Sequence, residues 1–437
     1  MTRDELRRAL IDWLEAQRLR YLTIANAKGI PTKVTVKEFL ATVQDEARTE
    51  SHQVDRSVSP FADFSDAYFD LAIETTRRRD DFTPPDILYE HYGNRCLVWS
   101  GAGISFFSGN AARDRAAEFL RLTSIKYLQQ IPALDVGSPG LAEGLIDNLL
   151  ELVEGTRIRL VQSVAIAGLR LSGPALNHGG VTVRELTGEE VGGLVQVRQP
   201  DWSPRRSPFA PYFPEFHSER CALIVRTEHV KTEQPRSSRL GAILLSLQLL
   251  GFDPRGSGEA ASETEPGPSI AGGGSRLRLS ATGEIRDFSS DDLRDVIQLA
   301  ALIPDEVFSG PKSRPTIALH RFGVAVGEKF PADALIDFVT ALEALLLTGR
   351  NELSYRLALY GAKYLSTDPG ERQRLFADLR ELYDVRSDLV HGTIGGLADP
   401  KLEALRRTAR ELAGRLLVKA LRDGWPSAKQ LDALTIA

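Results

Sequence analysis

Arg386 and His391 are the two residues of this chain best suited to do chemistry together. They are separated by four residues in the segment 382–392, LYDVRSDLVHG. Arg386 keeps its positive charge at physiological pH, whereas His391 gains or loses a proton near neutrality. Cleavage of an RNA phosphodiester by its own 2′-hydroxyl needs a base for the hydroxyl proton and a fixed cation for the charge that grows on phosphorus. The pair therefore indicates RNA transesterification that needs no metal.

The spacing of the pair limits how its two side chains meet. On a straight helix, positions five residues apart differ in direction by about 140° and in height by about 7.5 Å, so Arg386 and His391 do not share a face. Gly392 predicts the end of the helix, and in the last turn the helix dipole favours a protonated His391. A two-fold dimer would bring a second pair to the same phosphate, so that one histidine acts as base and the other as acid.

Polar neighbours of the pair are candidates for binding or orienting the substrate. Ser387 and Asp388 follow Arg386 directly, and Asp384 precedes it by two positions. The alternative interpretation is structural: Arg386 forms a surface ion pair with Asp384 or Asp388, and His391 only caps a helix. The flanking sequence decides between the two.

Three blocks of sequence are more specific than the pair alone. They are residues 334–347, ALIDFVTALEALLL, residues 352–359, ELSYRLAL, and residues 383–392, YDVRSDLVHG. With these blocks in this order, the chain from Phe330 to Asp423 resembles the ApeA-like HEPN domains, which occur in bacterial defence, toxin and RNA-processing proteins. The resemblance implies a four-helix domain, a homodimer and metal-independent endoribonuclease activity at Arg386 and His391. Other members of the family are degenerate, which leaves a non-catalytic RNA-binding or dimerisation scaffold as the alternative.

Three further residues are expected to support the site. Glu343 lies within an apolar stripe, where an unpaired carboxylate is costly. The family places a glutamate here, and we expect Glu343 to form an ion pair with Arg356 of the next helix. Tyr383 is expected in the core and not on a base-stacking surface.

The chain is too long for a single hydrophobic core, and its pattern of apolar residues changes twice along the sequence. We predict a multidomain α+β fold with a mostly helical region at 1–153, an α+β middle domain at 154–330 and a HEPN-like helical bundle at 331–437. Helices are expected at 111–128, 141–153 and 240–250. Short segments rich in β-branched or alternating apolar residues predict strands at 157–160, 180–186, 219–230, 276–281 and 316–320. Residues 253–275, rich in Gly, Ser, Pro and Glu, predict a disordered loop inside the middle domain.

The last domain has clear helix signals. Asp368 and Pro369 combine an N-cap carboxylate with proline at the first helical position, and Glu371 would complete a capping box. The last helix has one apolar face formed by Leu402, Leu405, Ala409, Leu412 and Leu416. Amphipathic helices joined by short turns predict a bundle.

A glycine-rich segment, residues 100–105 (SGAGIS), offers a competing hypothesis. It is similar to the Gly-Ala-Gly-x-Ser phosphate loop of sirtuins, and a strand–loop–helix unit of this kind cradles a pyrophosphate. The Asp-Phe-Arg segment of sirtuins is missing after the loop, however, and too few strands precede residue 155 for a dinucleotide-binding sheet. We interpret the loop as a chance match, and a sirtuin-like NAD-binding protein stays a remote alternative.

Net charge, cysteine content and hydropathy indicate where the protein acts and what it binds. The net charge of −5 gives no general attraction to nucleic acid, so RNA contact must come from a local basic surface. Two cysteines and no zinc-type spacing suit a reducing cytoplasm, and neither a secretory signal nor a membrane span is expected. We expect no metal or other cofactor. The expected partners are RNA, a second copy of the chain, and an unidentified trigger or inhibitor.

Overall fold

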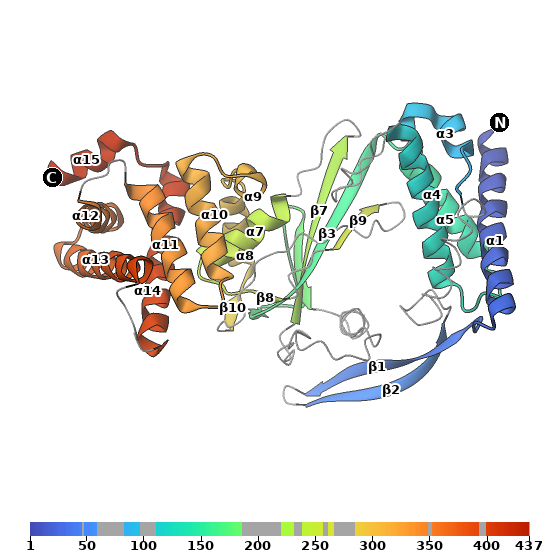
Figure 1. Ribbon diagram of the computed structural model, residues 1–437, viewed down its shortest axis with the longest axis horizontal. Coiled ribbons are helices and arrows are strands. Elements are labelled where there is room, and N and C mark those ends of the chain that lie inside the picture. Colours follow the sequence, from blue (N-terminus) through green and yellow to red (C-terminus); the bar gives the residue numbers. More distant parts are fainter. Residues whose placement is uncertain are drawn as a thin grey trace.

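The fold is α+β with helices predominating, in an elongated arrangement (Figure 1). This computed structural model describes residues 1–45, 48–58, 83–96, 111–185, 220–230, 238–256, 261–265, 285–347, 352–392 and 399–436. N-terminal helices lie at one end, an antiparallel sheet in the middle and C-terminal helices at the other end. Each part has its own cluster of buried apolar side chains.

The N-terminal core is formed by helices α1 (Arg3–Lys28), α3 (Ile87–Tyr92), α4 (Ala111–Gln130) and α5 (Pro139–Glu154), with a short 3-10 helix, η2 (Gly93–Cys96). The helices expected at 111–128 and 141–153 are thereby confirmed. At the start of α1, Thr2 and Glu5 form a capping box, because each side chain bonds the other's backbone N–H. Leu6, Leu10 and Leu14 recur at helical spacing and are fully buried in this core.

A long hairpin interrupts the helices of the N-terminal region and was not expected from the sequence. Strand β1 (Val34–Asp45) pairs antiparallel with β2 (Arg48–Val58). Val34, Val36 and Thr42 of β1 are β-branched residues, which favour a strand. Cross-strand pairing with β2 then stabilises the hairpin. The second strand is weakly patterned in the sequence, because polar residues predominate in it.

The middle sheet is antiparallel with the order β5-β6-β7-β3-β8, and β9 also pairs with β3. Its long strands are β3 (Arg157–Ala167) and β7 (Arg220–Val230), next to β5 (Ala175–His178) and β6 (Val181–Glu185). Alternate residues of β7, Cys221, Leu223 and Val225, are buried, as expected for a sheet with one covered face. Helices α7 (Ser238–Leu249) and α8 (Ser290–Ala300) supply the other side of this core. A separate parallel pair joins β4 (Leu169–Leu171) and β10 (Arg286–Phe288).

Two expectations for the middle region are wrong. Part of the expected disordered loop at 253–275 forms β8 (Arg255–Gly256) and β9 (Ala261–Glu265), which pair with β3 because β3 has a free edge there. The rest of that loop and the strand expected at 276–281 lie outside the described residues. Residues 316–320, expected as a strand, belong to helix α10 (Arg314–Val326). Ser313 caps α10, and a short β-branched segment cannot override a cap followed by helical spacing of apolar residues.

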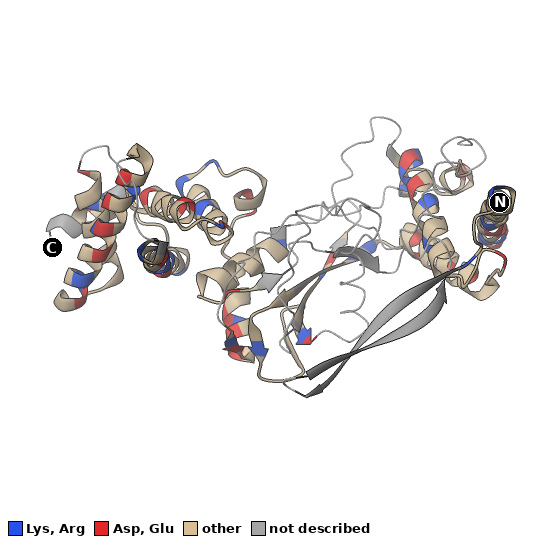
Figure 2. Cartoon of the chain, turned by 60° about the horizontal axis from the view of Figure 1, so that its bottom comes forward, with Lys and Arg blue, Asp and Glu red and all other residues tan. Residues whose placement is uncertain are grey.

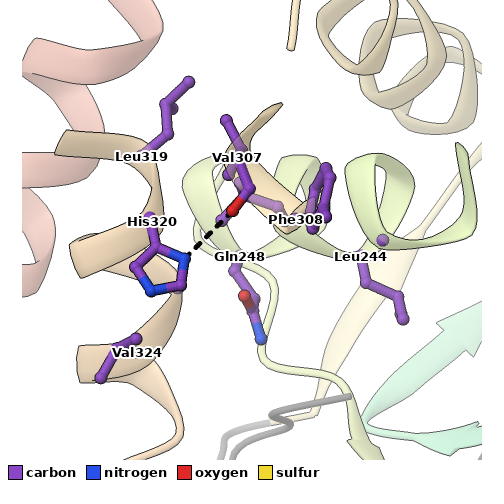
Figure 3. A pocket seen from close by; sticks show the side chains of 10 residues that line it. Leu244, Gln248, Val307, Phe308, Leu319, His320 and Val324 are labelled. Carbon is purple, nitrogen blue, oxygen red and sulfur yellow. Dashed lines mark hydrogen bonds between the residues drawn. The ribbon is translucent and has the colours of Figure 1, made fainter. Parts of the chain in front are cut away.

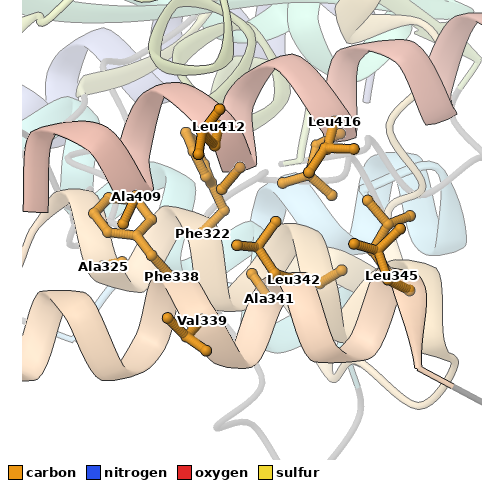
Figure 4. Packing of buried hydrophobic residues seen from close by; sticks show 14 of the residues in the cluster. Phe322, Ala325, Phe338, Val339, Ala341, Leu342, Leu345, Ala409, Leu412 and Leu416 are labelled. Carbon is orange, nitrogen blue, oxygen red and sulfur yellow. The ribbon is translucent and has the colours of Figure 1, made fainter. Parts of the chain in front are cut away.

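The C-terminal core contains α9 (Glu306–Ser309), α10, α11 (Pro331–Leu346), α12 (Leu353–Leu365), α13 (Pro369–His391), α14 (Asp399–Asp423) and α15 (Ala428–Ile436). Side chains of α10, α11 and α14 interdigitate at its centre (Figure 4). Phe322 of α10 meets Phe338 of α11 edge to face, with ring centroids 5.4 Å apart. Leu342 of α11 and Leu412 of α14 lie in the same centre of the core and are at most 3% exposed.

The boundary expected at residue 330 divides a core. Helix α10 precedes that boundary, yet Ala318, Leu319 and Phe322 are buried in the C-terminal cluster. Helix α7 contributes to two clusters: Leu245 and Leu249 face the C-terminal helices, whereas Ile243 and Leu247 face the sheet. The middle and C-terminal parts are therefore packed together without an intervening linker. Among the described residues, no helix is both long and apolar enough to cross a membrane.

Candidate functional site

Helix α13 carries most of the candidate site residues, and its ends are well defined. Asp368 caps the N-terminus, because its carboxylate accepts the backbone N–H of Glu371 at 2.7 Å. The expected capping box is not formed: the Glu371 side chain accepts from Ser366 and Arg415 instead, and Ser366 takes the Asp368 N–H. Leu375, Leu379, Leu382 and Val385 bury one face of α13 and fix its rotation.

Arg386 is held by a carboxylate from another helix. Its Nη2 lies 3.3 Å from Oε2 of Glu343 on α11, and the two side chains are only 25% and 21% exposed. This separation is at the long end of the range for a charged hydrogen bond, so the contact is loose. The Nε of Arg386 is buried and has no hydrogen-bond partner in the part of the chain that the structure describes. The guanidinium therefore retains donors that Glu343 does not use.

Glu343 pairs with Arg386 and not with Arg356, which corrects the sequence-based expectation. The physical reason is the packing of the helices: α13 runs past the C-terminal part of α11 and presents Arg386 there. Arg356 is half-buried on α12, and its charge acts on Tyr360. A partly buried carboxylate needs a cation beside it, and Arg386, a candidate site residue, supplies that cation for Glu343.

Burial dominates the electrostatics around Glu343. It raises the pKa of Glu343 above its ordinary value, and the charge of Arg386 only partly opposes this effect. Tyr383, on α13, is half-buried against the C-terminal core, which agrees with its expected structural role. Burial, followed by the negative charge of Glu343, raises the pKa of Tyr383 as well. The site thus has a partly dehydrated carboxylate and phenol beside one guanidinium.

His391 is the last residue of α13 and is exposed. Gly392 follows in the left-handed conformation, with φ 67°, and its N–H bonds the carbonyl groups of Asp388 and Leu389. The helix end predicted from Gly392 is confirmed, because glycine adopts this conformation at little cost. The imidazole makes no hydrogen bond to another described residue.

The remaining candidate residues lie along the same helix. Asp384 accepts a hydrogen bond from Ser354 Oγ at 2.9 Å and lies 3.9 Å from Arg380. Ser387 is half-buried and Asp388 is exposed. The structural alternative named Asp384 or Asp388 as the ion-pair partner of Arg386, and the salt bridge to Glu343 replaces that expectation.

Charged residues of both signs are interspersed along the C-terminal helices (Figure 2). On α13, Arg380 and Arg386 alternate with Glu381, Asp384 and Asp388. A continuous basic face of the kind that attracts nucleic acid at long range does not occur on this helix. Any RNA contact here depends on a few placed cations.

Comparison of the chain with protein-family models, curated proteins and solved structures finds no match in any of the three. Its function must therefore be inferred from the residues of the site. The glycine-rich segment 100–105 lies outside the described residues. Cys96, just before it, ends the 3-10 helix η2 and is buried, and Cys221 is buried in the sheet. No cluster of His, Cys, Asp and Glu able to hold a metal occurs in the described ranges.

Proposed function

We propose that this chain is a metal-independent endoribonuclease of the HEPN type, which cleaves RNA at a dimeric site formed by Arg386 and His391. The observation that carries the proposal is their shared helix end. Arg386 is a cation whose side chain is 25% exposed, and His391 is an exposed residue just over one turn later, at the C-terminus of α13. The helices α11 to α14 around them are consistent with the four-helix domain that the sequence resemblance implies.

The proposed reaction follows from the chemistry of the two groups. Neutral His391 removes the proton from a ribose 2′-hydroxyl, and the resulting oxygen attacks the adjacent phosphorus. Arg386 stabilises the added negative charge with its guanidinium N–H groups. The partner subunit's His391, protonated, donates a proton to the leaving 5′-oxygen as the P–O bond breaks. The products are a 2′,3′-cyclic phosphate and a free 5′-hydroxyl.

The first test is RNA cleavage by the purified full chain in EDTA. Arg386→Ala and His391→Ala should each reduce the cleavage rate by at least about 100-fold, which is the lower range for loss of a catalytic acid or base. Matched controls are Arg374→Ala, an exposed arginine of the same helix, and His178→Ala, an exposed histidine of the sheet. The cyclic phosphate end is identified by its resistance to phosphatase, which removes a terminal monophosphate. Full activity in both site variants, or cleavage only with added metal, would exclude the mechanism.

The second test concerns assembly. One Arg386/His391 pair supplies one base and no matching acid, so activity should require two copies. We expect light scattering to give a dimer, and specific activity to fall on dilution in step with the dimer fraction. A monomer with undiminished specific activity would refute a composite site.

A non-catalytic role is the second candidate, and a specific observation favours it. The Arg386 guanidinium is already engaged by Glu343, as in a purely structural ion pair. In that case the full chain binds single-stranded RNA or forms the dimer without cleaving RNA, and Arg386→Ala weakens binding alone. We further propose a cytoplasmic defence or toxin role in a bacterium, in which residues 1–330 restrain or target the C-terminal helices in response to an unidentified trigger or inhibitor.

A further inference from the structure

A cavity lies between helices α7, α9 and α10 (Figure 3), and its lining includes neither Arg386 nor His391. Its volume is about 220 Å³. Most of its lining is apolar, and the polar members are Gln248 of α7 and His320 of α10. The sequence alone assigns no role to His320, because a histidine without a partner at metal-ligand spacing gives no signal by itself.

The hydrogen bond of His320 fixes the character of its ring. Nδ1 lies 3.0 Å from the backbone carbonyl oxygen of Val307 on α9. Since a carbonyl oxygen only accepts, Nδ1 must carry the hydrogen in this bond. In the neutral ring, Nε2 then presents a lone pair and is an acceptor. No described residue donates a hydrogen bond to Nε2 in the structure. His320 lines the cavity, so a ligand there would lie beside a ring whose second nitrogen has no partner among the described residues.

Two glycines make room for an aromatic surface in the same cavity. A side chain at Gly241 of α7 would place its Cβ only 2.9 Å from the Phe308 ring, so glycine is what lets this ring lie against α7. Gly323 on α10 also lines the cavity, and a Cβ there would lie 3.4 Å from Leu245 Cδ1. Phe308 lines the cavity and is itself 42% exposed, so part of its ring is open to a ligand.

We propose that this cavity binds a small, neutral aromatic heterocycle or phenol with a single N–H or O–H donor. An apolar cavity of about 150 Å³ holds one benzene ring, so the present volume suits a bicyclic molecule such as indole. The ring packs against Phe308, Leu244 and Leu245, and its one donor bonds Nε2 of His320. A charged molecule is disfavoured, because the lining holds no Asp, Glu, Lys or Arg side chain to pair with it. The inference does not depend on the proposed RNase activity.

The test compares two probes of the same shape on the full chain. Indole has an N–H group, whereas indene replaces it with CH₂. Titration calorimetry or ligand-observed NMR should show that the wild type binds indole about five-fold more tightly than indene, the effect of one neutral hydrogen bond. His320→Phe should remove this preference and bind both probes alike. Val324→Trp, which fills the cavity from α10, should abolish the binding of both.

Circular dichroism and thermal melting establish that each variant is folded before its binding is interpreted. Because the two variants act differently, failure of one to fold leaves the other decisive. The proposal is overturned if the wild type binds neither probe at millimolar concentration. It is equally overturned if Val324→Trp binds both probes unchanged, or if folded His320→Phe keeps the preference for indole.

Discussion

Glu343 would compete with a phosphate for the guanidinium of Arg386. Their contact is long, at 3.3 Å, and burial makes the carboxylate easier to protonate. A loose partner of this kind holds the arginine side chain in place without occupying all of its N–H donors. If RNA binds at this helix end, Glu343 acts as a positioning residue. Arg386 then bonds a phosphate oxygen, either in place of the Glu343 carboxylate or together with it.

The raised pKa of Glu343 gives a stability prediction with a definite sign. The folded state binds a proton at Glu343 more readily than the unfolded state, so this contribution is fully present below pH 4.5 and is lost as pH rises through the raised pKa. Glu343→Gln removes the titration. The difference in melting temperature, wild type minus variant, should therefore decrease between about pH 4 and pH 7, as measured by circular dichroism.

Glu371 provides a control of opposite sign. Hydrogen bonds from Ser366 and Arg415 lower its pKa, so its contribution is present above pH 4.5 and is lost as pH falls. For Glu371→Gln, the same difference should shrink on acidification below pH 4.5. If the Glu343 difference instead grew with pH, the pairing with Arg386 would outweigh burial.

At the scale of the elements, α14 packs closely against the end of α7. A Cβ at Gly414 would lie 3.0 Å from the backbone carbonyl oxygen of Leu249, which cannot rotate away as a side chain can. Near this contact, Arg410 of α14 forms a 2.7 Å ion pair with Asp253 and also bonds the Phe252 carbonyl. These contacts connect the C-terminal helices to the segment that leaves α7.

Gly414→Ala should lower the free energy of unfolding by about 1–3 kcal/mol, the usual cost of overpacking, in spite of the better helix propensity of alanine. Gly144→Ala is the matched control, because Gly144 lies inside α5, where an added methyl group would meet no described atom within 4 Å. It should raise the stability of its helix by about 0.5–1 kcal/mol. Urea unfolding followed by fluorescence and circular dichroism measures both. Equal effects of the two substitutions would mean that the α7–α14 contact is not tight.

At the scale of the whole molecule, no C-terminal fragment that begins at residue 331 contains its complete core. Phe322 from α10 packs on Phe338, and Leu245 and Leu249 from α7 join the same cluster. Loss of α10 exposes this surface to water and leaves a cavity beside α11. The proposed control of the C-terminal site by the middle part would have a direct physical route through these shared side chains.

We therefore expect the fragment 331–437 to be aggregated or to melt at least about 10 °C below the fragment 311–437, and both to melt below the full chain. Size-exclusion chromatography and thermal melting by circular dichroism provide the comparison. A fragment 331–437 as stable as the longer one would show that α10 belongs to the middle domain, as the sequence suggested. This experiment also decides which fragment is suitable for testing dimerisation of the C-terminal helices.

The sequence by itself determined the local features of this protein. The stop at Gly392, the cap at Asp368 and the capping box of Thr2 and Glu5 were predictable, because each depends on residues within one turn of helix. The apolar faces of α11 and α14 were predictable for the same reason, since their periodicity is visible in the sequence. The choice of Arg386 and His391 as candidate residues also came from the sequence, from their types and spacing together with the flanking blocks.

Only the tertiary structure decided which distant residues meet. It paired Glu343 with Arg386 in place of Arg356, made residues 316–320 a helix shared with the C-terminal core, and drew 261–265 into the sheet. It also formed the cavity at His320 from three helices that no local pattern brings together. The physical reason is that ion pairs, strand edges and cavities arise from contacts between elements far apart in the chain, where packing overrides local propensity.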